Sequence, residues 1–144
     1  MGLAFCPNLT FLNLKNNDLR DIAGIETLPS LRTINLSSND LKHVRGLAHC
    51  KALEEADLST NDLTDLPSVL ALATCPRLRT LNLQDNDFSK SQCGQIAKHF
   101  RQRDLVVTQV DAAVLRNPAL DTRAVRVRPV SSPARDGEHS ADGE

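Results

Sequence analysis

The sequence predicts an α/β solenoid, a short right-handed superhelix with a curved parallel sheet of about five strands on its concave side. Turns or short helices are expected on the convex side. Three observations predict this fold: one pattern of apolar residues and an Asn recurs four times, each copy alternates like a short strand, and the intervening segments carry turn or helix signals. One copy cannot bury its own apolar side, so the copies must stack into a continuous core.

The repeat has the pattern L-x-x-L-x-L-x-x-N-x-L, and its first copy is "LTFLNLKNNDL". The later copies are "LRTINLSSNDL", "LEEADLSTNDL" and "LRTLNLQDNDF". They begin at residues 9, 31, 53 and 78, so the spacings are 22, 22 and 25 residues. In the central L-x-L, both Leu side chains point inward and the residue between them points outward, which is the alternation of a strand.

This pattern resembles the leucine-rich repeat family over roughly residues 6–111, and its two 22-residue units are similar to the short intracellular class. It is similar to the phosphatase-regulator, axonemal dynein light chain and spliceosomal relatives within this family. The resemblance implies a protein–protein interaction scaffold in the cytoplasm, the nucleus or the cilium. It also implies that partners dock on the concave face.

The segments between the copies differ in their predicted structure. In the first two units an apolar-x-Gly-apolar pattern around Gly24 and Gly46 predicts short turns or 3₁₀ segments. In the third unit, Pro67 stands where a helix would begin. In the fourth, Ser89 and Gln92 form a predicted capping box for a helix, which "DLVVTQV" follows as a fifth strand. The apolar stripe of this helix is Cys93, Ile96, Ala97 and Phe100.

The recurring Asn has two interpretations. Its amide carries both donors and an acceptor, so it can pair the inward-turned backbone groups of neighbouring units. Alternatively, the Asn and the Asp that follows it form a row of cation ligands, which the mutual repulsion of carboxylates disfavours. We therefore predict a structural ladder and no metal site. The ladder residues are Asn17, Asn39, Asn61 and Asn86.

The cysteines and histidines do not predict a metal or catalytic site. Cys6, Cys50 and Cys75 each stand three residues before the first Leu of a unit, where Leu28 stands in the second unit, so this position is a predicted core row. Thiols are expected, although Cys50 and Cys75 on adjacent units leave a disulfide geometrically open. No phosphate loop, nucleophile motif or zinc spacing occurs. We therefore predict no enzyme activity and no cofactor.

The resemblance assigns a partner-binding surface to the side chains that flank the buried leucines. Glu54, Glu55 and Asp57 gather negative charge on the third unit, and Phe11 is the only aromatic residue predicted on the surface. A partner that offers Arg, Lys or amide donors together with an apolar group would match this face. The predicted site residues are Phe11, Asn13, Arg32, Asn35, Glu54, Glu55, Asp57, Arg79 and Asn82.

The chain divides into four predicted regions: an N-terminal edge (1–8), the repeats (9–111), a flanking helix with a basic arm (112–130) and a disordered tail (131–144). The net charge is −1, but residues 98–135 carry 8 Lys and Arg against 3 Asp and Glu. Two alternative functions stay open. In one, the basic arm contacts RNA in a ribonucleoprotein; in the other, the chain regulates an enzyme such as a phosphatase. The arm residues are Arg123, Arg126 and Arg128.

The start of the chain and its apolar runs indicate where the protein is located and how the repeat array begins. The start "MGLAFCPN" does not read as a signal peptide, and no apolar run reaches the ~20 residues that span a bilayer, so an intracellular protein without membrane contact is expected. The first unit has no recognisable polar cap. Its open edge is either covered by a partner or continued by further repeats.

Overall fold

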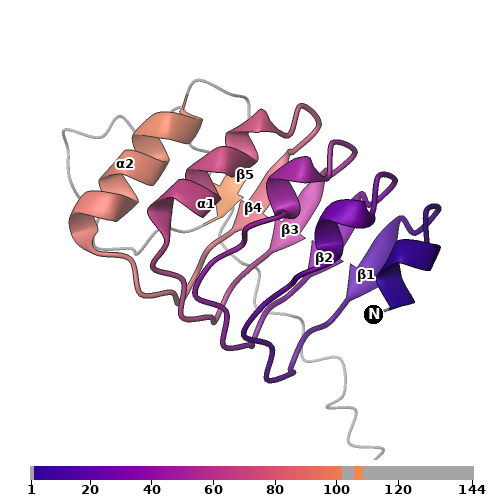
Figure 1. Cartoon of the computed structure of the whole chain (residues 1–144). Helices are drawn as coiled ribbons and strands as arrows, with labels where there is room; N and C mark the ends of the chain where they lie inside the picture. Colours follow the sequence, from indigo (N-terminus) through magenta and orange to yellow (C-terminus); the bar gives the residue numbers. More distant parts are fainter. Residues whose placement is uncertain (1, 102–105, 109–144) are drawn as a thin grey trace, which may run out of the picture.

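A computed structural model of the chain describes residues 2–101 and 106–108. It contains a parallel sheet whose five strands follow one another in chain order, with a layer of short helices along one face of the sheet (Figure 1). The predicted α/β solenoid is confirmed. The strands are β1 (Phe11–Asn13), β2 (Thr33–Asn35), β3 (Glu55–Asp57), β4 (Thr80–Asn82) and β5 (Val106–Thr108).

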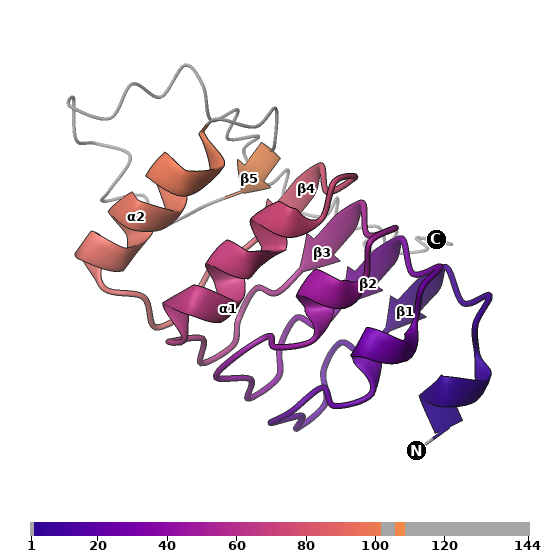
Figure 2. The same ribbon diagram turned by 45° about the horizontal axis from the view of Figure 1, so that its top comes forward.

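The convex layer changes from 3₁₀ to α-helical along the chain, and its elements lie side by side (Figure 2). The 3₁₀ segments expected after Gly24 and Gly46 are present, and both glycines have a φ of 98° that disfavours a side chain. Ser89 and Gln92 form the predicted capping box of the last helix. The elements are η1 (Gly2–Phe5), η2 (Ile25–Thr27), η3 (Leu47–His49), α1 (Leu66–Leu70), η4 (Ala71–Thr74) and α2 (Lys90–Phe100).

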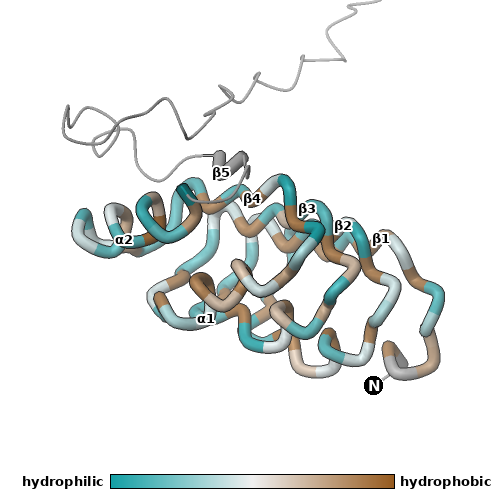
Figure 3. The backbone as a smooth tube through the Cα atoms, turned by 90° about the horizontal axis from the view of Figure 1, so that it is seen from above, coloured by the Kyte–Doolittle hydropathy of each residue, from teal (hydrophilic) through white to brown (hydrophobic). Residues whose placement is uncertain are grey.

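A single apolar core lies between the sheet and the helices. Figure 3 shows brown, hydrophobic residues recurring both along the strands and along the convex segments. Ile34, Leu36 and Leu58 from the strand segments are no more than 1% exposed. In β1 the equivalent Leu12 and Leu14 remain half-buried, because β1 is the first strand of the described sheet and only β2 pairs with it. The core is therefore complete in the middle rungs and open at the N-terminal one.

The residues that precede the first copy form half of a unit. "GLAFCPNL" (residues 2–9) aligns with "GIETLPSL" (24–31) and "GLAHCKAL" (46–53), and it folds into the same 3₁₀ segment as they do. Leu3 and Cys6 pack against the core in this segment. The repeat pattern did not predict this half-unit, because residues 2–9 lack the Asn-containing half of the pattern.

Each rung turns out of its strand through a residue in the left-handed region. Asn16, Ser38, Thr60 and Asp85 have φ values between 54° and 58°, and each stands directly before the ladder Asn. This conformation turns backbone carbonyls toward the interior, where solvent cannot reach them, so they need a donor from the protein. Asn and Asp tolerate such φ values better than Ser or Thr do.

The ladder asparagines supply that donor. Asn61 Nδ2 donates to the carbonyls of Leu58 (3.1 Å) and Ser59 (3.2 Å) in its own turn, and to Leu36 (3.0 Å) in the preceding rung. Its Oδ1 accepts the backbone N–H of Leu41 at 3.1 Å, also from the preceding rung. One buried side chain thus makes four hydrogen bonds, of which two hold its own turn and two connect it to the preceding rung.

The same geometry recurs with one exception. Asn39 and Asn86 make the equivalent bonds to the rungs before them, and adjacent amides share a carbonyl acceptor such as that of Leu36. Asn17 is exposed and bonds only within its own turn, to the carbonyls of Leu14 and Lys15. The ladder therefore bridges rungs at three of its four predicted positions. The aspartates that follow the ladder residues are exposed: Asp18, Asp40, Asp62 and Asp87.

Cys50 and Cys75 are fully buried on adjacent rungs and are thiols, with no disulfide between them. The Cys50 Sγ lies 3.3 Å from the carbonyl oxygen of Ile25, to which the thiol donates. Burial is the main cause that raises the pKa of Cys50 from 9.0 to about 11. The neighbouring Cys75 and Glu26 raise this pKa further, and Lys51 lowers it. The thiol is therefore neutral at physiological pH and behaves as part of the apolar core.

Substitution of Asn61 by Ala should destabilise the fold far more than substitution of Asn17 by Ala. Asn61→Ala removes the acceptor of the buried Leu41 N–H and leaves a void, which costs about 2–3 kcal/mol, whereas Asn17→Ala should cost under about 1 kcal/mol. Denaturant unfolding of the two variants measures the difference. Equal losses would mean that the cross-rung bonds do not stabilise the fold.

The Cys50 thiol should make stability fall at alkaline pH. The unfolded thiol ionises near pH 9.0 and the folded one near about 11, so its contribution is present below pH 9 and lost as the pH rises toward 11. Relative to Cys50→Ala, the wild type should lose on the order of 2 kcal/mol of unfolding free energy across this window. Parallel unfolding curves for the two proteins at all pH values would contradict the assignment.

Candidate functional site

The outward side of the sheet carries two rows of side chains in exact strand register. Phe11, Thr33, Glu55 and Thr80 pair as Cα partners along one row, and Asn13, Asn35, Asp57 and Asn82 along the other. A third row stands one residue before the strands and holds Thr10, Arg32, Glu54 and Arg79. The outward side that carries the first two rows is called the concave face below, and six of the nine predicted partner-binding residues belong to these rows. The other three, Arg32, Glu54 and Arg79, belong to the third row at the edge of this face.

Much of the second row serves the fold. Asp57 Oδ1 accepts the backbone N–H of Ser59 at 3.0 Å and its hydroxyl at 2.6 Å. Asn35 Oδ1 does the same for Ser37, at 3.0 Å and 2.7 Å. In the outer rungs, Asn13 accepts from the Lys15 N–H and Asn82 from the Gln84 N–H. One oxygen of each side chain thus holds the turn that follows its strand, in the manner of an Asx turn.

The row before the strands contains one ion pair. Arg32 Nη1 lies 3.7 Å from Glu54 Oε1, and the Glu54 side chain is 31% exposed. Arg79 is exposed on the other side of Glu54, and within residues 2–101 it forms no ion pair with it. At this distance and exposure the pair contributes ~0–1 kcal/mol. The alternating charges predicted along this row are therefore paired on one side only.

Glu55 and Asp57 are the unpaired acids of the face. Glu55 is exposed and Asp57 half-buried, and neither forms an ion pair among the described residues. Both carboxylates belong to β3, two residues apart, so they project from the same side of the sheet. The negative charge predicted for the third unit is thus concentrated on these two residues, because Glu54 is offset by Arg32.

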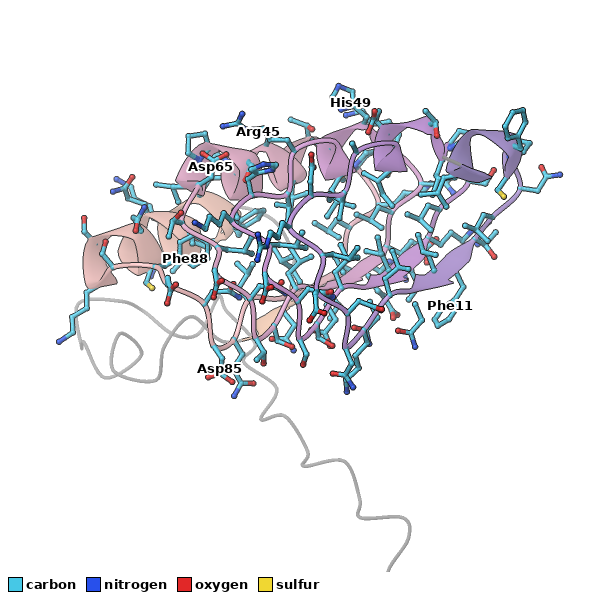
Figure 4. The ribbon with its side chains drawn as sticks, turned by 60° about the horizontal axis from the view of Figure 1, so that its bottom comes forward. Phe11, Arg45, His49, Asp65, Asp85 and Phe88 are labelled. Atoms are coloured by element: carbon cyan, nitrogen blue, oxygen red, sulfur yellow. The ribbon has the colours of Figure 1, made fainter. Side chains whose placement is uncertain are left out.

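The concave face holds an open depression of about 310 Å³ around these acids. Its charged lining residues are Glu55 and Asp57, and Phe11 contributes an aromatic edge. Phe11 is 58% exposed and lies on the sheet side, away from Arg45 and His49 on the convex side (Figure 4). The lining residues are Phe11, Thr33, Ile34, Asn35, Glu55, Ala56, Asp57, Thr80 and Asn82.

Phe11 is not the only exposed aromatic residue, which corrects the expectation from the sequence. Phe5 is 87% exposed, because η1 points it away from the core while Leu3 packs inward. Alignment of residues 2–9 with the later 3₁₀ segments would have revealed this, since Phe5 takes the place of Thr27 and His49. Both of those residues are exposed.

Neither a metal-binding cluster nor a membrane-spanning helix occurs in the described part of the chain. Residues 2–101 and 106–108 hold no group of three or more His, Cys, Asp or Glu side chains close enough to bind a metal ion. Within those residues, no helix combines the length and apolar character that crossing a bilayer requires. The arm residues Arg123, Arg126 and Arg128, with the predicted regions 112–130 and 131–144, lie outside the described residues.

Comparison with known proteins finds repeats of one family. A family model described as "Leucine Rich repeats (2 copies)" matches residues 7–47. A comparison with curated protein sequences finds no match.

Among the solved structures similar to the chain are two internalins. An internalin, InlF, from Listeria monocytogenes has a TM-score of 0.58 and 22% identity, with coverage of 78% of this chain and 33% of the internalin. Internalin C2 from the same species has a TM-score of 0.43 and 20% identity, with coverage of 81% and 70%. The chain thus spans about a third of the length of InlF. The leucine-rich repeats at residues 7–47, the stacking of the strands into one parallel sheet and the likeness to InlF show that this chain has a leucine-rich repeat solenoid fold.

Proposed function

We propose that this chain is a non-catalytic interaction scaffold that binds a basic segment of another protein on its concave face. The observation that carries the proposal is the depression whose two charges, Glu55 and Asp57, are both negative and unpaired among the described residues. Stacked repeats generate extended concave surfaces of this kind, which suit the binding of elongated segments.

The free hydrogen-bonding capacity of the depression defines the chemistry of the partner. Asp57 Oδ1 is already occupied by Ser59, so Oδ2 and the carboxylate of Glu55 remain for an incoming donor. Carboxylates accept but do not donate, and Arg or Lys side chains satisfy them most strongly. The partner should therefore present cationic side chains over β3.

Phe11 supplies the apolar part of the proposed interface. It stands in the same row as Glu55, with Thr33 between them, and more than half of its surface is still exposed. Complete burial of a Phe side chain contributes ~1.5–3 kcal/mol, so about half of this remains available to a partner. An aromatic edge beside two carboxylates also suits an Arg side chain, whose guanidinium can stack on the ring.

The observations do not favour the other two functions that the sequence leaves open. An RNA contact would rest on the basic arm, which lies outside the described residues. Phosphatase regulation is one form of scaffolding and needs a partner identity that the concave face does not specify. The proposal is therefore limited to a protein partner with basic character.

Removal of the two charges should weaken partner binding without disturbing the fold. The double variant Glu55→Gln, Asp57→Asn keeps the side-chain oxygen that accepts from Ser59, because Asn retains an Oδ1 atom. Asn35 accepts from Ser37 in this way in the neighbouring rung. Loss of two interfacial charge contacts should lower the affinity for the partner about 10-fold or more. Quantitative capture of partners on the immobilised full chain, wild type against variant, measures this.

A matched control removes the same charge elsewhere. Asp40→Asn, Asp62→Asn changes two exposed acids that line a separate depression with Arg20 and Lys42. The control should retain partners at wild-type levels. If partners are lost equally from both double variants, or from neither, the concave face is not the binding surface.

A further inference from the structure

We propose that the chain's own segment 123–130, "RAVRVRPV", occupies the concave depression in an extended conformation, with Arg126 and Arg128 on Glu55 and Asp57. This inference rests on the proposed function, because the segment would compete with the partner for the same carboxylates. It makes the concave face a self-regulated site. Three features support it: the negative charge of the depression, the interval between its two carboxylates and the length of chain between β5 and the segment.

Charge complementarity is the first step. The charged residues that line the depression are both acidic, and they find no cationic partner within residues 2–101. Between Thr122 and Arg135 the sequence has four Arg and no Asp or Glu. The segment thus offers the charge that the depression lacks, on the same polypeptide.

The spacing of the two charge pairs also matches. Glu55 and Asp57 are separated by two residues of one strand, a rise of about 6.6 Å, and both point out of the concave face. Arg126 and Arg128 alternate with Val125 and Val127, so an extended segment would put both guanidinium groups on one side at the same interval. A segment laid along β3 would therefore place each Arg over one carboxylate, with the planar donor pairs that carboxylates accept best.

The segment can reach the depression easily. β5 ends at Thr108, and β4 alone separates β5 from β3, so the two strands lie about 10 Å apart. Seventeen residues lie between Thr108 and Arg126 (126 − 108 − 1 = 17), and they span up to about 55 Å when extended. A tether of this length gives an effective concentration on the order of millimolar, so even a weak contact would be populated.

Competition for the partner follows from this occupancy. A partner binds only the fraction of molecules whose depression is free, and its apparent dissociation constant rises by the reciprocal of that fraction. We take an effective concentration of about 1 mM for the segment and an intrinsic dissociation constant of about 0.1–1 mM for its contact with the depression. The apparent dissociation constant of the partner would then rise about 2- to 11-fold. Partners that neutralise or displace the segment would unmask it.

Amide chemical shifts of the full chain test the intramolecular contact. Arg126→Gln, Arg128→Gln should shift the resonances of Thr33, Glu55 and Thr80, and added salt should shift the wild type toward the variant. The control Arg116→Gln, Arg135→Gln removes two Arg that flank the segment and should shift none of them. The wild-type shifts should not change on dilution. Absence of these shifts in the variant would overturn the proposal, and shifts that disappear on dilution would assign the contact to a second copy instead.

A synthetic peptide of residues 121–131 tests the competition. The labelled peptide should bind the full chain carrying Arg126→Gln, Arg128→Gln about 2- to 11-fold more tightly than the wild type, because the variant's own segment no longer competes. Equal affinities would overturn the inference. The proposed function is judged separately, by partner capture on Glu55→Gln, Asp57→Asn, and survives if that variant loses partners while the peptide affinities are equal.

Discussion

The structure depends on one constraint: the backbone polar groups that turn inward at the end of each strand must be paired away from water. The left-handed residue before each ladder Asn turns these groups toward the core, and the Asn amide then satisfies them. Because one amide serves two rungs, this requirement also fixes how neighbouring rungs stack. The regular strand register of the sheet follows from it.

This division of labour determines which polar groups are available for recognition. The ladder Asn residues and one oxygen of each second-row side chain are used inside the fold. The groups that remain in the depression include the carboxylate of Glu55, the second oxygen of Asp57 and the edge of Phe11. The proposed function uses these groups because folding leaves them free, and a cationic extended segment is a ligand that fits the two carboxylates.

The sequence specified the strands, the rows and the ladder because each depends on a short local pattern that repeats. It did not specify how a side chain divides its oxygens. Asn13, Asn35, Asp57 and Asn82 looked like free surface residues, yet each holds a turn through a residue two positions later. That contact depends on the direction in which the chain leaves the strand. A row of residue types does not contain that information.

End effects were the other feature that periodicity could not provide. A repeat pattern treats every copy as equivalent, so it assigned Asn17 the same bridging role as Asn61. In the structure Asn17 bonds only within its own turn, because β1 is the first strand of the described sheet. Phe5 was missed for a related reason, since it lies in a half-unit that lacks the Asn motif. Three-dimensional neighbours, rather than residue type, decide these positions.

Amide hydrogen exchange at Leu41 tests the central claim most directly. The Leu41 N–H has a side-chain acceptor on the following rung, Asn61 Oδ1 at 3.1 Å, and the residue is fully buried. If the ladder holds the rungs together, this proton should exchange only when the whole repeat array opens, at a rate close to that of global unfolding. Exchange as rapid as that of a solvent-exposed loop amide would show that the rungs separate locally, and would contradict the account.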